Sequence, residues 1–162
     1  MNNKRDLSIL MIEDDPDDRY ITEAAFRESN YQITIDFLTA PHDLIGYLKD
    51  TEQQAGLPSL IIIDRQLPGI DGLEILRQLK ASEEFGFIPA VMISGTAYPK
   101  IVDESYRLGV NSFIQKPDSG RLTTDRIEAF INYWFGIVDL PNIGQKTEHE
   151  KSEARKRYIV RI

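Results

Sequence analysis

Five short, strongly apolar runs alternate with longer amphipathic segments along this chain, and no other feature of the sequence restricts its fold as much. The apolar runs have the length of strands and are predicted as such: Leu7–Ile12, Tyr31–Leu38, Leu60–Ile63, Ile88–Ile93 and Ser112–Gln115. The third run shows no polar alternation, as is typical of a parallel strand that is covered on both faces. Strict alternation of strands and helices predicts an α/β fold, a five-stranded parallel, doubly wound sheet with helices on both faces.

A segment with helical periodicity follows each of the predicted strands. The first helix is expected to begin at Pro16, with Asp15 as its cap, and to run to about Ser29. Pro41 opens the second helix and Gly56 closes it. The other three are expected around Leu73–Leu79 after a loop with the sequence LPGIDG, over about Lys100–Leu108, and over roughly Thr123–Val138.

The composition excludes several classes of protein. A net charge of −7 and a sequence pI of about 4.9 argue against nucleic-acid binding as the main activity. The chain has no cysteine and two histidines, which disfavours disulfides, thiolate metal sites and multi-histidine centres. The N-terminal residues do not form a signal peptide, and no run reaches the ~18 apolar residues of a membrane span. We therefore expect a cytoplasmic protein that binds neither nucleic acid nor a membrane.

Reactive side chains stand where four of the five predicted strands end. Glu13 and Asp14 follow the first strand, Asp64 the third, Ser94 ends the fourth and Lys116 follows the fifth. Ligands of doubly wound sheets bind beyond the carboxyl ends of the strands, near the point where the strand order switches. In a flavodoxin-like order the first and third strands are neighbours, so the three carboxylates are expected to converge.

Three converging carboxylates repel one another unless a cation lies between them. Hard oxygen ligands in a small open site favour Mg²⁺, and one carboxylate could then attack a phosphoryl donor. Lys116 would supply positive charge to the transferred group, and Ser94 a hydrogen-bond donor. Each feature alone has a simpler explanation: a solvated helix-capping loop, the end of a strand, a Ser-Gly turn and a Lys-Pro pair. Their ordered combination favours a functional site.

The ordered motifs ILMIEDD, IIIDRQLPGIDG, VMISGT and FIQKP, spread over about residues 7–138, resemble the receiver domains of two-component response regulators. The resemblance implies that Asp64 accepts the phosphoryl group and that Lys116 and Ser94 assist. It implies that Glu13, Asp14 and Asp64 bind Mg²⁺, together with a backbone carbonyl of Arg65 or Gln66, of which the family spacing favours Gln66. Ser94 and Phe113 would form the conformational switch, and a cis bond would precede Pro117.

The resemblance also implies the function and the partners. We expect a single-domain response regulator that takes a phosphoryl group from a sensor histidine kinase, or exchanges it with a histidine phosphotransfer protein. It would catalyse only its own phosphorylation and dephosphorylation. The YWF motif and Leu140-Pro141 are similar to stand-alone regulators associated with bacterial phytochromes. The main alternative is a phosphorylation-independent adaptor; a flavodoxin or a transcription factor fits less well, because the chain lacks a phosphate loop and a helix-turn-helix segment.

The end of the chain carries two further expectations. In the last predicted helix, Ile127, Ile131 and Trp134 share a core-facing stripe with Phe130 and Val138, whereas Tyr133, Phe135 and Ile137 lie off it. The off-stripe residues could form a homodimer surface or a kinase contact. We place the domain at residues 1–141 and a tail at 142–162, which is either frayed or an added edge strand.

Overall fold

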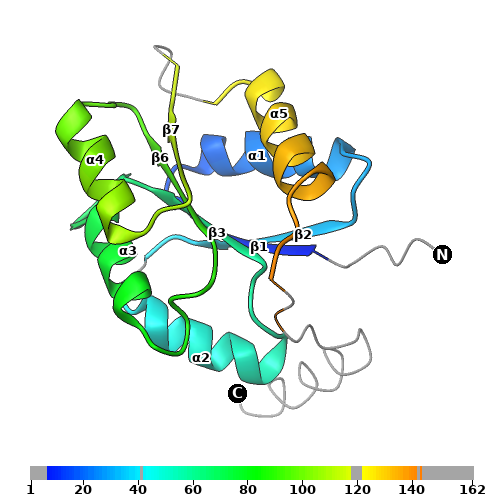
Figure 1. Ribbon diagram of the computed structural model, residues 1–162. Helices are drawn as coiled ribbons and strands as arrows, with labels where there is room; N and C mark the ends of the chain where they lie inside the picture. The colour runs from blue at the N-terminus through cyan, green and yellow to red at the C-terminus, as the bar shows by residue number, and fades with distance from the viewer. Residues whose placement is uncertain (1–6, 41, 118–121, 142, 144–162) are drawn as a thin grey trace.

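A computed structural model describes residues 7–40, 42–117, 122–141 and 143, and these form one parallel sheet between two layers of helices (Figure 1). The sheet has the order β2-β1-β3-β6-β7. Its strands are β1 (Leu7–Ile12), β2 (Ile33–Leu38), β3 (Leu60–Asp64), β6 (Ala90–Ser94) and β7 (Ser112–Gln115). All four neighbouring pairs are parallel. The predicted fold class is therefore confirmed.

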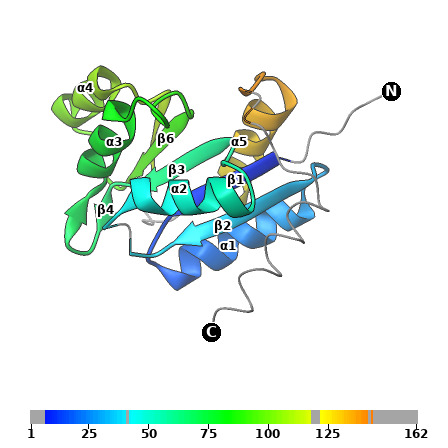
Figure 2. The same cartoon turned by 90° about the horizontal axis from the view of Figure 1, so that it is seen from below.

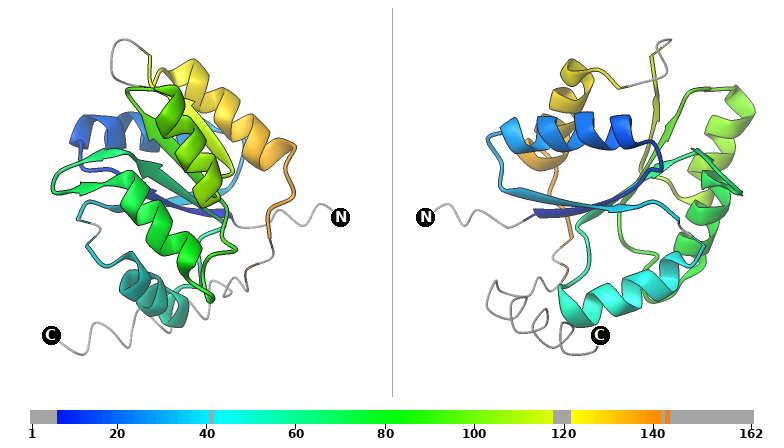
Figure 3. Two further views of the ribbon diagram at one scale, coloured as in Figure 1. Left: turned by 60° about the vertical axis from the view of Figure 1, so that its left-hand side comes forward. Right: turned by 180° about the vertical axis from the view of Figure 1, so that it is seen from behind.

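Helices cover both faces of the sheet (Figures 2 and 3). Their bounds are α1 (Pro16–Glu28), α2 (Leu44–Gln54), α3 (Gly72–Ala81), α4 (Pro99–Leu108) and α5 (Thr124–Gly136). α1 and α5 share a buried cluster with the residues of one sheet face, and α2 and α3 share the other cluster. Each predicted helix is present with ends shifted by a few residues. Pro41, expected to open the second helix, lies outside the described residues.

The start of α1 shows why the acidic run after β1 does not continue as a solvated loop. Asp15 is the N-cap, and its carboxylate accepts hydrogen bonds from the backbone N–H groups of Asp17 and Asp18. Pro16 occupies the first helical position, where a missing N–H costs nothing. The prediction of Asp15 as the cap is confirmed. The cap turns the chain close to the sheet edge, so α1 begins beside the strand ends.

The expected loop after β3 is a short hairpin, in which β4 (Gln66–Leu67) pairs antiparallel with β5 (Ile70–Asp71). Gly69 has a φ of 77°, a conformation that favours glycine in the turn. A Cβ on Gly72 would lie 2.5 Å from the backbone oxygen of Asp64. Only glycine therefore allows α3 to start so close to the end of β3.

The segment after α5 joins the two halves of the core. Leu140 packs in the cluster on the α1 and α5 side, and Ile143 in the cluster on the α2 and α3 side. The chain therefore runs from one face of the sheet to the other, beyond the predicted domain boundary at residue 141. The tail expected at 142–162 lies outside the described residues except for Ile143. Among the described residues, no helix is long and apolar enough to cross a membrane.

Candidate functional site

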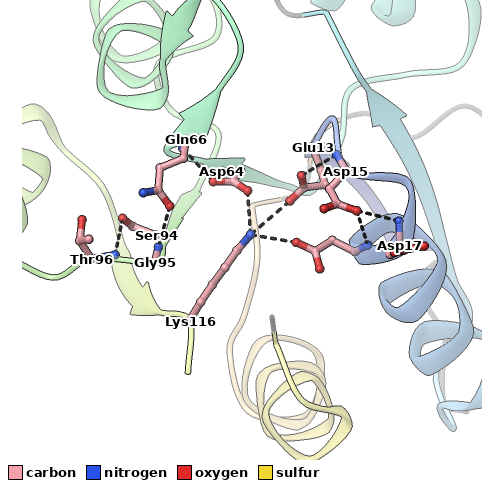
Figure 4. A network of polar contacts seen from close by, with 10 residues as sticks. Glu13, Asp15, Asp17, Asp64, Gln66, Ser94, Gly95, Thr96 and Lys116 are labelled. Carbon is pink, nitrogen blue, oxygen red and sulfur yellow. Dashed lines mark hydrogen bonds and ion pairs between the residues drawn. The ribbon is translucent and has the colours of Figure 1, made fainter. Parts of the chain in front are cut away.

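The register of the sheet places four strand ends at one edge (Figure 4). Ile12 is level with Ile63, so Glu13 and Asp64 leave neighbouring strands side by side. Asp64 is level with Ile93, and Ser94 with Gln115, which brings Ser94 and Lys116 to the same edge. Glu13, Asp64, Ser94 and Lys116 are all buried. The convergence expected from the sequence is therefore present for these four residues.

The Lys116 ammonium lies among three carboxylates. Its Nζ atom is 2.8 Å from Asp64 Oδ2, 2.9 Å from Asp18 Oδ2 and 3.7 Å from Glu13 Oε2. Burial lowers the pKa of Lys116, but the hydrogen bonds to Asp64 and Asp18 more than offset this, and the pKa stays above its ordinary value. Lys116 is therefore charged at every pH at which the protein would work.

Glu13 is the least satisfied acid of the site. One of its oxygens accepts the backbone N–H of Asp15 at 2.9 Å, whereas the buried Oε2 has no hydrogen-bond partner. Burial raises the pKa of Glu13 to about 8, helped by the neighbouring Asp64 carboxylate, and Lys116 only partly counters the rise. Near neutral pH the Glu13 carboxyl is largely protonated, and a bound cation would take the place of that proton.

The residues present fit a divalent cation. Oxygens of Glu13, Asp18 and Asp64 lie within 4.8 Å of one another. The buried Glu13 Oε2 has no hydrogen-bond partner, so it is available as a metal ligand. Carboxylate oxygens are the ligands that Mg²⁺ and Mn²⁺ prefer. We refer to Glu13, Asp18 and Asp64 as the acidic triad.

The triad differs from the predicted ligand set at one position. Asp14 is half-buried and is not one of the three acids, so its role as a metal ligand stays a prediction. Asp18 was missed, because the run EDDPDD gives no sign of which acid turns inward. A usable signal exists: Asp18 is the third residue after the Asp15 cap, a position that faces back toward the cap and the strand end.

The hairpin supports Gln66 over Arg65 as the residue whose carbonyl faces the site. The Arg65 carbonyl already accepts the N–H of Gly72 at 2.8 Å, across the hairpin. In an antiparallel pair of strands, hydrogen-bonded and non-hydrogen-bonded residue pairs alternate. Because Arg65 is bonded to Gly72, the next pair, Gln66 and Asp71, is not hydrogen-bonded, and the backbone groups of Gln66 face away from β5. Its N–H accordingly donates to Asp64 Oδ1 at 2.9 Å. Because the N–H and C=O of one residue in a strand point to the same side, we expect the Gln66 carbonyl on that side too.

Ser94 and its neighbours form the wall of the site beyond Asp64. The Ser94 hydroxyl is fully buried and accepts the N–H of Thr96 at 3.2 Å. The Gln66 side chain accepts the N–H of Gly95 at 3.1 Å, which ties the hairpin to the end of β6. Backbone N–H groups thus anchor this wall.

Phe113 lies one strand further along, half-buried against the α2 and α3 side of the core. Its backbone N–H donates to the Tyr106 hydroxyl of α4 at 3.2 Å. The backbone of Phe113 is therefore linked to α4 by one hydrogen bond. The structure contradicts the other expectation for this strand: no cis peptide bond occurs among the described residues, so the bond before Pro117 is trans. Lys116 reaches the acids without it.

The chain matches known proteins over most of its length. Residues 9–128 match the family described as the response regulator receiver domain. The probable methanogenesis regulatory protein FilR2 of Methanothrix harundinacea is 30% identical over 129 residues, which cover 79% of this chain and 83% of FilR2. Response regulator Rcp1 of Synechocystis sp. is 24% identical over 135 residues, 82% of this chain and 92% of Rcp1. The chain spans about half the length of several other relatives.

Solved structures of two stand-alone regulators share the fold. The Mn(2+)-bound form of Rcp1 has a TM-score of 0.71 and 25% identity, over 83% of this chain and 99% of Rcp1. The phosphorylated cyanobacterial phytochrome response regulator RcpA has a TM-score of 0.77 and 24% identity, over 85% of this chain and 100% of RcpA. The former is described as holding Mn(2+).

Proposed function

Because the chain belongs to the response regulator receiver domain family, we propose that it is a phosphorylation switch of a two-component system with Asp64 as the acceptor. The phosphoryl group would pass from a histidine nitrogen of the donor to a carboxylate oxygen of Asp64, as the N–P bond breaks and an O–P bond forms. The observation that carries the proposal is the buried Asp64 carboxylate, held by Lys116 and the Gln66 N–H beside two other acids.

We propose Glu13, Asp64 and the Gln66 carbonyl as ligands of Mg²⁺, and keep Asp14 as a candidate for a further one. Bound Mg²⁺ would neutralise the acids and draw negative charge off the transferred group. Lys116 would meet the phosphoryl oxygens from the opposite side, since its ammonium already lies 2.8 Å from Asp64. The Ser94 hydroxyl would leave the Thr96 N–H and donate to the same group.

Signalling would follow from two conformations of the region around β7. When Ser94 turns toward the phosphoryl group, it vacates space that the Phe113 ring would fill. Because the Phe113 N–H is bonded to Tyr106, the change would reach the exposed surface of α4. The protein would catalyse only its own phosphorylation and dephosphorylation.

The proposed partner is a sensor histidine kinase, of phytochrome type by analogy with the described role of RcpA, or a histidine phosphotransfer protein. We propose a cytoplasmic location and no binding to nucleic acid, in keeping with the net charge of −7. A homodimer through α5 is a separate proposal with its own test.

The test of the switch is phosphorylation by acetyl phosphate with Mg²⁺, read by intact mass. We expect wild type to gain one phosphoryl group, Asp64→Asn to gain none, and a chelator to abolish the gain. Asp36→Asn, which removes an exposed acid from β2, is the matched control and should label like wild type. Absence of labelling in wild type, with no detectable Mg²⁺ binding, would favour the phosphorylation-independent adaptor.

A further inference from the structure

Lys116 is held from two sides by acids that belong to different elements. Asp64 ends β3, whereas Asp18 lies in the first turn of α1, and their Oδ2 atoms are 2.8 and 2.9 Å from Nζ. Asp18 is only 8% exposed and Lys116 only 9%. Figure 4 shows the lysine side chain extended from the end of β7 toward Asp64. The arrangement is a two-point anchor.

The two contacts change differently when Asp64 is modified. On phosphorylation one Asp64 oxygen becomes part of an acyl phosphate, the carboxylate charge is lost, and the hydrogen bond to Lys116 weakens. Asp18 is not modified and keeps its place, because its backbone N–H is fixed to the Asp15 cap at 3.3 Å. The Lys116 side chain is long and loses much rotamer freedom when it is held. A constant partner would keep its ammonium beside the reacting group in both states.

We propose that Asp18 is a positioning residue that holds the Lys116 ammonium at Asp64 before and after phosphoryl transfer. The proposal rests on the proposed function of Asp64. It differs from the alternative in which Asp18 is a ligand of the cation. Because Lys116 already occupies Asp18 Oδ2, a cation on that oxygen would have to share it with a positive charge or displace the lysine.

The experiment compares Asp18→Asn with Asp17→Asn, which removes a charge from the same turn but at an exposed position. Both variants are phosphorylated with acetyl phosphate at saturating Mg²⁺, and Mg²⁺ affinity is measured separately. We expect Asp18→Asn to slow labelling by about tenfold, the worth of one charge-assisted hydrogen bond, with Mg²⁺ affinity changed less than about twofold. Asp17→Asn should behave like wild type.

A double mutant with Lys116→Met separates positioning from a general effect of charge. Without the lysine, Asp18→Asn should cause no further loss of rate, because the two residues act as one unit. A tenfold or larger loss of Mg²⁺ affinity in Asp18→Asn would make Asp18 a metal ligand and overturn the proposal. An unchanged or faster rate, or full additivity with Lys116→Met, would overturn it too. If Asp18→Asn does not fold, Asp18→Ser replaces it.

Failure of the proposed function has a different signature. In that case wild type itself is not labelled at Asp64. The anchor is then tested by thermal unfolding of wild type, the two single variants and the double mutant. A coupling between Asp18 and Lys116 that is within measurement error of zero would overturn the anchor whatever the function of Asp64.

Discussion

At the scale of the residue, the buried acid Glu13 has the greatest influence on the site, because its protonation depends on whether a cation is bound. With no cation nearby, the raised pKa of Glu13 favours its protonated form. With a cation, Glu13 Oε2, which has no hydrogen-bond partner, is available as a ligand. The same burial that makes the ionised form costly also makes the site ready for a cation.

A pH dependence of stability follows from the raised pKa of Glu13. The folded pKa of about 8 lies above the unfolded value of 4.5, so the folded state binds more protons in this window. The contribution of Glu13 to the free energy of unfolding is complete below pH 4.5 and is lost as the pH rises through about 8. Lys116 does not contribute to this change, because its raised pKa keeps it charged throughout. We expect the cation-free protein to melt at a lower temperature at pH 9 than at pH 6.

Thermal unfolding in chelator, for wild type and Glu13→Gln, measures this effect. Glu13→Gln cannot ionise and should lose less stability between the two pH values. Added Mg²⁺ should restore part of the wild-type loss at pH 9, since a cation that binds only the folded state stabilises it. Parallel pH curves for wild type and Glu13→Gln would contradict the assignment to Glu13.

At the scale of the element, the site depends on how each strand end is joined to the next segment. The Asp15 cap starts α1 soon after β1, and Gly72 lets α3 begin against the end of β3. Where α3 leads into β6, Lys80 donates to the carbonyls of Gly86 and Ile88, at 3.0 and 2.8 Å. That lysine fixes the connection between the two elements.

We predict that Lys80→Met lowers the free energy of unfolding by about 1–3 kcal/mol, because two carbonyls lose their donor. The methionine keeps most of the apolar stem, so packing changes little. Urea unfolding gives the measurement, and Lys100→Met, at an exposed position of α4, is the control, with an expected change within about 0.5 kcal/mol. Labelling of Asp64 should persist in Lys80→Met. If Lys80→Met and Lys100→Met had the same free energy of unfolding, Lys80 would not stabilise the connection between α3 and β6.

At the scale of the whole molecule, α5 presents an apolar surface that the described residues leave exposed. Tyr133 is 52% and Ile137 76% exposed, as their place off the predicted stripe indicated. Phe135 differs, because its ring packs on Phe26 and Tyr31, with centroids 6.3 and 6.4 Å apart. Any homodimer through this helix would therefore use Tyr133 and Ile137 and leave Phe135 in the core.

The dimer is tested by light scattering after size exclusion, with and without beryllofluoride as a phosphoryl mimic. We expect a dimer in at least one state, and a monomer for the double variant Tyr133→Glu and Ile137→Glu, whose charges would be costly to bury. Tyr20→Glu, at an exposed tyrosine of α1, is the control and should keep the wild-type mass. A wild-type monomer in both conditions would end the homodimer proposal.

Local sequence determined the elements and the four inward-facing residues at the strand ends. Periodicity marks the five strands of the main sheet and the five helices within a few residues, because burial of an apolar face requires it, but it does not mark the short β4–β5 hairpin. A side chain that follows a buried parallel strand must emerge at the carboxyl edge of the sheet, so Glu13, Asp64, Ser94 and Lys116 could be grouped from the order of the residues alone. Asp15 could be assigned as the cap because Pro16 fixes where the helix starts.

Only the tertiary structure decided which neighbours those residues meet. Asp18 enters the triad because the first turn of α1 places it beside Glu13 and Asp64, and the run EDDPDD does not itself show which acid turns inward. The packing of Phe135 on Phe26, more than 100 positions away, is also a long-range contact. The raised pKa of Glu13 arises from burial and from the Asp64 carboxylate, 51 positions away along the chain. The local sequence pattern thus determined the secondary structure, whereas contacts between distant elements determined the ion pairs and the pKa values of the site.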